Sequence, residues 1–512
     1  MFTHFLKNLQ PSPPFMRPYF SCSILVCAVL LTACDDSQPE RSTAPNVARG
    51  AQLSGSGAIV VDIGNDTTAQ NETPIAVNPT NPQNFIVGAN DWNYNDGCAV
   101  NASFDGGKTW TPTVPNGFLP GVTKYTNDPN VPGTGTGDFG GDPAVAFGKD
   151  GTAFYVCYTY RASGYGSLKA QLLLSTSTDG GKTWRAGGSK APLTVVAQWD
   201  ANGITKGSTG QFQDHESIWV DPTDGRIYIT WAQFHGNGSN SPIYVAVSSD
   251  GGKTFSTPAQ ITASTVRSNQ DARVVTNGNG SHAYLTFDNG AQGGKGAAMY
   301  VSESPDRGIT WGVPVRFATF NNMVCLFPPY CFNVSGTPFR GPGSYPVPAF
   351  DPMRNRLYVA YADIVGGRAQ LFLASAPASG VTDPTSWTII PMAPGASGDR
   401  LNVEMNIERG SGRIDFISDD RSYSNNTLVD ITYGNSTDGG ATFVTQRVTR
   451  KGFDPAQYGV PSGNAAGFRP FIGDYNGIVS LPTSAAFAWT GVGKSYGYPP
   501  INLDIFFGSV TP

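Results

Sequence analysis

An eight-residue pattern, Ser-x-Asp-x-Gly-x-Thr followed by an aromatic residue, recurs along this 512-residue chain. Glycine adopts positive φ angles without steric cost, and an Asp side chain accepts hydrogen bonds from nearby backbone amides. The pattern therefore predicts the tight turn of a β-hairpin. Clear copies begin at Ser103, Ser177, Ser248, Ser304 and Ser436, and a degraded copy lies between Ser375 and Trp387. We expect the five Asp residues to hold turns together rather than to catalyse a reaction: Asp105, Asp179, Asp250, Asp306 and Asp438.

A second repeat predicts the number of structural units. Each copy is a short apolar strand, a turn rich in Gly, Pro, Asn or Asp, and a second apolar strand. The copies begin at Thr73, Asp142, Glu216, Asp271, Pro346, Val403 and Asn476. Their spacing of about 55–75 residues suits a four-stranded sheet with its loops. The sequence therefore predicts an all-β, seven-bladed β-propeller over residues 57–512, with six blades as the alternative if one hairpin is misassigned.

The two ends of this region predict how the ring closes. The last hairpin is followed by a single strand, INLDIFFGSV, so the seventh blade lacks a fourth strand. The segment GAIVVDI, from Gly57 to Ile63, is rich in β-branched residues and lies just before the first hairpin. We expect this N-terminal strand to complete the last blade, because closure removes an exposed sheet edge.

Composition agrees with this fold class and narrows the partners. The chain has 62 Gly and 39 Pro and is only 14% charged, which favours a turn-rich β-protein over long helices. Its net charge of −5 is mild, and no cluster of Lys and Arg suggests a nucleic-acid surface. We expect a monomer that does not bind nucleic acid.

The N-terminal residues 1–33 have the pattern of a secretory signal peptide. A basic residue, Arg17, precedes an apolar run from Ile24 to Leu31, which is shorter than the about 20 residues that a membrane span needs. Small residues follow, up to Cys34. Met16 is an alternative start, because residues 1–15 add nothing that such a signal requires.

The segment Leu31-Thr32-Ala33-Cys34 resembles the lipobox of bacterial lipoproteins. That resemblance implies cleavage before Cys34, acylation of this residue and a lipid anchor in the cell envelope, either periplasmic or on the surface. An ordinary signal peptide with a chance Cys is the alternative. Residues 34–56 are polar and rich in Ser, Pro and Gly, and we expect them to form a flexible tether.

Four further cysteines are expected to form structural disulfides, because export exposes them to oxidising conditions. Cys325 and Cys331 are close in sequence, which leaves Cys98 to pair with Cys157. None of the four has zinc-ligand spacing with a nearby His. We predict no metal centre and no cofactor, with a structural calcium ion left open.

In a propeller, the first strand of each blade lines the central channel, so residues at the starts of these strands converge at one mouth. Acidic residues recur at this position, as a glycosidase carboxyl pair requires. The candidate catalytic residues are Asp142, Glu216, Asp271, Asp474 and Tyr475, and the candidate substrate-binding residues are His215, Glu404, Arg421 and Arg469. The alternative is that the acids only cap strand ends and bond to neighbouring loops.

Both repeats resemble those of sialidases, whose Asp boxes follow the same pattern, over most of the region after residue 56. The segments Gly141-Asp142-Pro143 and Phe471 through Gly477 also resemble a broad group of exported bacterial proteins labelled sialidase-like. The resemblance implies a propeller that acts on glycans, with three arginines, a Tyr nucleophile, a Glu and an Asp in a true sialidase.

The chain departs from that sialidase pattern where the first arginine should lie. The first hairpin reads NETPIAVNP, and no Arg occurs between Arg49 and Arg161. Residues that other blades could supply are Arg273, Arg340, Arg421, Arg469, Tyr345 and Tyr475. The sequence thus favours a carbohydrate-active propeller, a glycoside hydrolase other than a true sialidase, and the alternative is a non-catalytic scaffold that binds glycan or protein.

The lipid anchor can be tested by cell fractionation. Wild-type protein is expected in the membrane fraction, whereas Cys34→Ala should lose acylation and fail to mature normally. Cys27→Ala, within the apolar run, is the matched control and should still fractionate with membranes. A wild-type product that is cleaved elsewhere and stays in the soluble fraction would contradict the lipobox.

Overall fold

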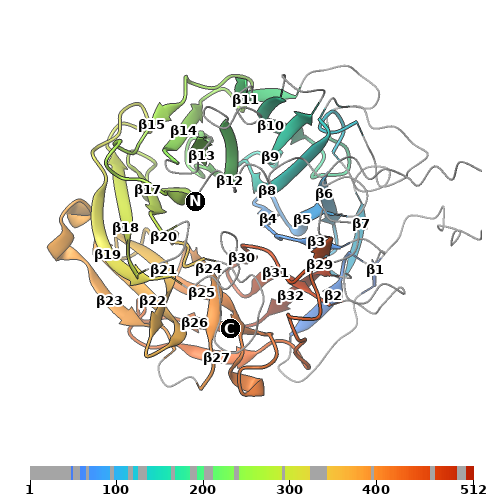
Figure 1. Cartoon of the computed structure of the whole chain (residues 1–512), viewed down its shortest axis with the longest axis vertical. Coiled ribbons are helices and arrows are strands. Elements are labelled where there is room, and N and C mark those ends of the chain that lie inside the picture. The colour runs from blue at the N-terminus through green and yellow to red at the C-terminus, as the bar shows by residue number, and fades with distance from the viewer. Residues whose placement is uncertain are drawn as a thin grey trace, which may run out of the picture.

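The seven-bladed β-propeller predicted from the repeats is confirmed. A computed structural model describes residues 48–49, 58–64, 69–92, 97–112, 119–124, 135, 137–162, 168–184, 193–200, 211–235, 241–290, 295–322, 343–393, 397–461, 468–492 and 503–512. Seven antiparallel sheets are arranged around a central axis, with the first strand of each sheet innermost (Figure 1).

Each blade is built from strands in chain order from the axis outwards. Blade one is β4 (Ile75–Asn78), β5 (Asn81–Asp91), β6 (Gly97–Ser103) and β7 (Thr109–Pro112). Blade two is β8 (Phe139–Phe147), β9 (Ala153–Ala162), β10 (Leu168–Ser177) and β11 (Thr194–Asp200). Blade three is β12 (Gln211–Val220), β13 (Ile227–His235), β14 (Ile243–Ser248) and β15 (Ala259–Gln260).

The remaining blades follow the same order. Blade four is β16 (Gln270–Thr276), β17 (Ala283–Asp288), β18 (Lys295–Ser304) and β19 (Val315–Asn321). Blade five is β20 (Val347–Asp351), β21 (Arg356–Val365), β22 (Arg368–Pro377) and β23 (Thr388–Pro391). Blade six is β24 (Arg400–Glu408), β25 (Arg413–Asp420), β26 (Asp430–Ser436) and β27 (Val444–Arg447).

Blade seven joins the two ends of the described chain, as predicted. It consists of β30 (Gly477–Ser480), β31 (Ala485–Gly491), β32 (Asp504–Val510) and β2 (Ile59–Asp62). The N-terminal strand pairs antiparallel with β32, from Ile59 opposite Ser509 to Asp62 opposite Phe506. This pairing closes the ring and covers the edge of β32, and β2 becomes the outer strand of blade seven.

Short additional strands extend this pattern. The two-residue strand β1 (Ala48–Arg49) pairs with the outer edge of β7, although it lies in the segment predicted to be a tether. The strand β3 (Gln70–Asn71) pairs with β5 next to β4, and β28 (Val460–Pro461) pairs with β29 (Phe468–Arg469) before blade seven begins.

The hydrophobic core is divided among the interfaces between blades. Seven clusters of buried side chains each draw on two neighbouring blades, so every blade is packed on both faces. Aromatic pairs cross several of these interfaces, such as Trp110 of blade one with Phe507 of blade seven at 5.1 Å between ring centroids. Because each interface has its own core, a long chain folds as one ring without a single large centre.

The Asp boxes form tight turns, as predicted, and the structure places them between the third and fourth strands of their blades. In all five, the Thr hydroxyl donates to Asp Oδ2 at 2.6 Å. The Thr backbone N–H donates to Oδ1 at 2.8–3.0 Å, and the Ser hydroxyl donates to the same oxygen at 2.7–2.9 Å. The degraded copy lies between β22 and β23, where Asp383 accepts hydrogen bonds from the amide and hydroxyl of Thr385.

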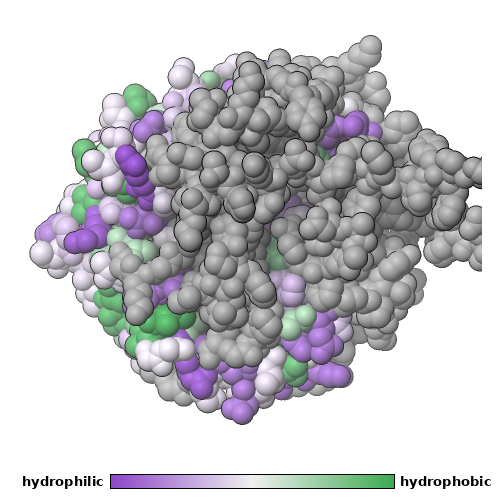
Figure 2. Space-filling model, in the orientation of Figure 1, coloured by the Kyte–Doolittle hydropathy of each residue, from purple (hydrophilic) through white to green (hydrophobic). Residues whose placement is uncertain are grey.

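The predicted disulfide between Cys98 and Cys157 is confirmed and links β6 of blade one to β9 of blade two. The positions Cys325, Cys331 and Cys34, and the signal segment 1–33, lie outside the described residues, so their predictions stand as made. No helix in the described part of the chain is long and apolar enough to span a membrane. The described rim of blades four to six presents a mixture of hydrophilic and hydrophobic side chains (Figure 2).

In each box the Asp carboxylate accepts several hydrogen bonds and so stabilises the turn, which we call its stapling role. This role predicts the effect of removing one carboxylate. We expect Asp250→Ala to lower the free energy of unfolding by about 1–2 kcal/mol, because it deletes the acceptor for Ser248, Thr254 and the Lys253 amide. Lys253→Ala is the matched control, since the backbone amide remains, and its effect should stay within about 0.5 kcal/mol. Equal effects of the two substitutions in denaturant unfolding would contradict the stapling role.

Candidate functional site

The inner strands begin with a repeated backbone irregularity. Glu72, Asp142, His215, Asp271 and Asn402 all have positive φ, between 49° and 60°. In blades two, three, four and six, the register between the first two strands shifts at this residue, which marks a β-bulge. Asn, Asp and His are the non-glycine residues that best tolerate this conformation. Each bulge breaks the ladder and frees polar groups to bond across to another blade.

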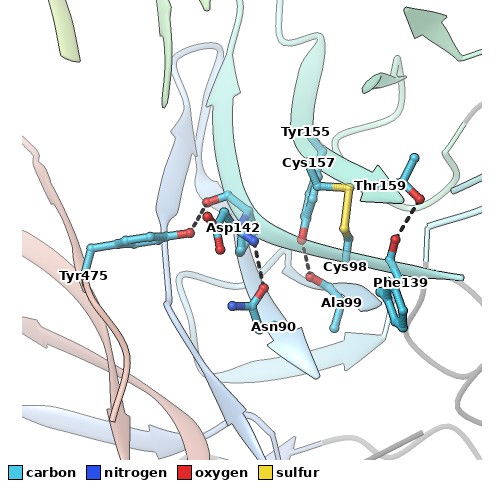
Figure 3. The surroundings of a disulfide bond; sticks show 10 residues. Asn90, Cys98, Ala99, Phe139, Asp142, Tyr155, Cys157, Thr159 and Tyr475 are labelled. Atoms are coloured by element: carbon cyan, nitrogen blue, oxygen red, sulfur yellow. Dashed lines mark hydrogen bonds between the residues drawn. A yellow bond between two sulfur atoms is a disulfide. The ribbon is translucent and has the colours of Figure 1, made fainter. Parts of the chain in front are cut away.

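These groups connect blades seven, one, two and three by hydrogen bonds. The Asp474 amide donates to Glu72 Oε1 at 3.1 Å, and Asn90 Nδ2 donates to Glu72 Oε2. The Asp142 amide donates to Asn90 Oδ1 at 2.9 Å, and the His215 amide donates to Asp142 Oδ2 at 2.9 Å. Figure 3 shows the contact of Asn90 with Asp142 close to the disulfide.

The imidazole of His215 lies at the centre of the next group of contacts. Its Nδ1 contacts Asp271 Oδ1 in blade four. Its ring centroid lies 4.9 Å from that of Tyr345 and 4.9 Å from that of Tyr475. The Tyr475 hydroxyl donates to the backbone oxygen of Pro143 at 2.9 Å, which brings blade seven against β8 (Figure 3).

An ion pair connects blades four and six past blade five. Arg273 Nη1 and Nη2 donate to the two carboxylate oxygens of Glu404 at 2.7 and 2.8 Å. Two residues earlier, Asn402 donates to Asp419 Oδ2 at 3.1 Å, and Asn476 of blade seven donates to Asp419 Oδ1 at 3.3 Å. We call the whole set of contacts, from Asp474 through Glu72, Asp142, His215 and Asp271 to Arg273, Glu404 and Asp419, the axial polar cluster.

A small pocket adjoins this cluster on the side of blades five and six. It is lined by Gly343, Tyr345, Ala362, Asn402, Val403 and Glu404. Glu404 retains 8% of its side-chain exposure, and its partner Arg273 retains 18%. Its lining therefore presents a carboxylate, an amide and an aromatic ring.

Burial changes the proton affinity of the cluster. Desolvation raises the pKa of Asp142, and it raises those of Glu216 and Asp271 well above their usual range. It also lowers the pKa of His215 to about 4, because the charged imidazolium is poorly solvated and Arg273 is near. His215 is therefore neutral at pH 7, and the three carboxyl groups hold their protons more tightly than exposed acids do.

The four acids predicted to share one site are brought together. Asp142 interacts electrostatically with Asp474 and Glu216, and Asp271 interacts with Asp474 and Glu404. Their surroundings are more enclosed than an open mouth would be, since Glu216, Asp271 and Asp474 are 2%, 0% and 7% exposed. Asp142 is half-buried. Glu404 is the predicted residue that lines the pocket, and the catalytic and binding roles stay predictions.

Two predicted binding arginines are not part of this cluster as described. Arg421 is 0% exposed, with Nη1 at 3.6 Å from Asp399 and Nη2 donating to the Asn426 backbone oxygen. Its guanidinium is enclosed by protein and supports the loop after β25. Arg469 lies in β29, and its side chain is outside the described part of the structure.

Three features of the site did not follow from the sequence: the Arg273–Glu404 ion pair, the Asn402–Asp419 contact and the contact of Tyr345 with His215. The partners are 131 residues apart in the first case, so spacing gives no signal. The recurrence of Asp, His and Asn near the starts of the inner strands was the available signal for the bulges. Among the described residues, no group of three or more His, Cys, Asp or Glu side chains is arranged to hold a metal ion.

No protein-family model matches the sequence, and no curated protein matches it. A protein of unknown function from Dyadobacter fermentans is similar in structure, with 14% identity and a TM-score of 0.44 over 75% of this chain and 97% of that one. A sialidase from Streptococcus pneumoniae has 10% identity and a TM-score of 0.44 over 88% and 94% of the two chains. An α-L-arabinanase from Penicillium chrysogenum, complexed with arabinobiose, has 12% identity and a TM-score of 0.41 over 72% and 92%. Identity at this level does not identify an activity.

The buried acids predict how stability depends on pH. Burial raises the pKa of Asp419 from 3.8 to about 7, so the folded state holds this proton more tightly than the unfolded state. Its contribution to stability is present below about pH 4 and is lost as the pH rises to 7. Asp419→Asn cannot lose that proton, so the variant should gain stability relative to wild type over this range, by on the order of a few kcal/mol.

Denaturant unfolding at several pH values between 4 and 8 measures this difference. Asp150→Asn, in an exposed turn of blade two, is the control and should follow the wild type throughout. A difference between Asp419→Asn and wild type that stays constant with pH would show that Asp419 does not titrate in this window.

Proposed function

We propose that this chain is an exported, lipid-anchored β-propeller that binds a glycan in the pocket beside Arg273 and Glu404 and hydrolyses a glycosidic bond there. The observation that carries the proposal is the meeting of Glu404 with Asp271 and Arg273, near the starts of inner strands from different blades, with Asp142 joined to the same group through His215. Glycoside hydrolysis generally needs two carboxyl groups in one site, one of them able to donate a proton.

The surroundings of the two kinds of carboxyl support different roles. Burial keeps Asp271 and Asp142 protonated to higher pH than an exposed acid, as a proton donor requires. Glu404 lines the pocket and is fixed in orientation by two hydrogen bonds from Arg273. Tyr345 and Asn402, which also line the pocket, offer a ring face and an amide that suit a sugar.

The arginines of the described site support a substrate other than sialic acid. Arg273 has both terminal nitrogens engaged by Glu404, and Arg421 is enclosed beside Asp399. Blade one begins with Glu72 where a sialidase would have its first arginine. Such a site is poorly suited to clamp a substrate carboxylate with three guanidinium groups.

A non-catalytic glycan-binding or protein-binding scaffold is the second candidate. The observation in its favour is the burial of Glu216, Asp271 and Asp474, which bond or interact across blades rather than face an open cleft. In this case the acids would fix the geometry of the ring, and only the pocket beside Glu404 would contact ligand.

A screen of chromogenic glycosides and polysaccharides, combined with a glycan array, separates the two candidates. For the hydrolase, we expect turnover of at least one substrate by wild type and a loss of about 100-fold or more in Glu404→Gln. Glu303→Gln, which alters a rim ion pair with His282 in blade four, is the matched control and should retain full activity. Glycan binding without turnover of any substrate would leave the glycan-binding scaffold. Neither binding nor turnover would contradict both the hydrolase and the glycan-binding scaffold and leave only a protein-binding one.

A further inference from the structure

The axial polar cluster is unusually rich in carboxyl groups. Its carboxyl groups are those of Glu72, Asp142, Asp271, Glu404, Asp419 and Asp474. Glu216 adjoins the cluster and interacts electrostatically with Asp142. Among the side chains described in this cluster, Arg273 is the one that carries positive charge at neutral pH. Both of its terminal nitrogens are bound to Glu404, so its charge is already matched by an adjacent carboxylate.

His215 does not supply a second positive charge. Its pKa of about 4 keeps the imidazole neutral at pH 7. With Nδ1 turned to Asp271, Nε2 lies on the other side of the ring, is buried, and has no hydrogen-bond partner among the described residues. His215 is only 4% exposed, so bulk water does not form a hydrogen bond with Nε2.

Glu216 is a second buried group whose carboxyl oxygens have few hydrogen-bond partners. It is 2% exposed, and neither carboxylate oxygen accepts a hydrogen bond from a described side chain. Buried polar atoms are normally paired, because an unmade hydrogen bond is costly. Two buried groups that lack side-chain partners on these atoms, beside an excess of carboxyl groups, therefore indicate that the cluster would gain from a polar ligand that carries positive charge.

The aromatic residues beside His215 suit the same ligand. The rings of Tyr345 and Tyr475 flank the imidazole, and Tyr345 also lines the pocket. The face of a Tyr ring attracts a cation through its quadrupole, and it also packs against the apolar face of a sugar.

We infer that the ligand of this pocket is a glycan with free amino groups, an amino sugar bound as its ammonium ion, and that glycans bearing carboxylates are disfavoured. The inference rests on the proposed glycan-binding function and specifies its substrate class. An ammonium group beside the cluster favours the ionised form of carboxyl groups that burial otherwise keeps protonated to higher pH, whereas a uronate would add a negative charge in a poorly solvated site.

Titration calorimetry with three oligosaccharides of matched length tests this substrate class. The probes are a fully deacetylated chito-oligosaccharide, its N-acetylated counterpart and an oligogalacturonate, at about pH 5.5, where sugar amines are largely protonated and uronates are ionised. We expect the deacetylated probe to bind at least about tenfold more tightly than the N-acetylated one, and the oligogalacturonate to bind most weakly. The advantage of the deacetylated probe should shrink as salt is added.

Two variants with opposite changes in charge separate electrostatics from damage to the fold. Glu404→Gln leaves the charge of Arg273 unmatched, so the preference for the deacetylated probe over oligogalacturonate should fall. Arg273→Gln leaves Glu404 unmatched, so the same preference should rise. Glu303→Gln on the rim is the control and should leave the preference unchanged. Structural damage would move both pocket variants in the same direction, and that result would overturn the inference.

The outcomes distinguish this inference from the proposed function. If the N-acetylated probe or another neutral glycan binds as tightly as the deacetylated one, the charge preference is wrong while glycan binding stands. Preferred binding of oligogalacturonate would also overturn the preference alone. If no glycan of any charge binds, the proposed function fails and the inference fails with it.

Discussion

A left-handed residue near the start of the inner strand in blades two, three, four and six, and just before that strand in blade one, is the constraint on which the axial site depends. Glu72, Asp142, His215, Asp271 and Asn402 adopt positive φ, a conformation that costs a non-glycine residue on the order of 1 kcal/mol or more. The bulge that results aims amides and side chains at the neighbouring blade. Because the closed ring fixes the positions of both partners, the hydrogen bonds between blades can stabilise positive φ at these residues. An isolated strand would not keep this conformation.

The two ends of a blade carry different kinds of polar chemistry. At the outer turns, the Asp boxes repeat one set of hydrogen bonds with the same 2.6 Å contact from Thr to Asp in five blades. At the inner ends, the equivalent positions hold acids, a His and an Asn that bond to different partners. A uniform scaffold thus supports a site in which each blade contributes a different group, which is where function on a propeller has to lie.

The concentration of acids near the axis has an energetic consequence. Burial raises the proton affinity of Asp142, Glu216, Asp271 and Asp419, so part of the cluster is held neutral instead of being paired with cations. The ion pair of Arg273 with Glu404 is the main internal compensation. The same surplus that weakens the fold at higher pH favours a positively charged ligand, so stability and ligand preference have one electrostatic cause.

The sequence by itself determined the repeat, the blade count, the closing strand and the stapling role of the Asp boxes, because each depends on local turn chemistry or on strand periodicity. It also placed Asp142, Glu216, Asp271 and Asp474 at one end of the channel, since equivalent positions in a ring must meet there. Tertiary structure alone decided that these acids are enclosed, that Arg273 is bound to Glu404, and that Arg421 is buried beside Asp399. Those outcomes depend on the direction in which each side chain points at a β-bulge and on its partners in other blades. The spacing of residues along the chain encodes neither of these.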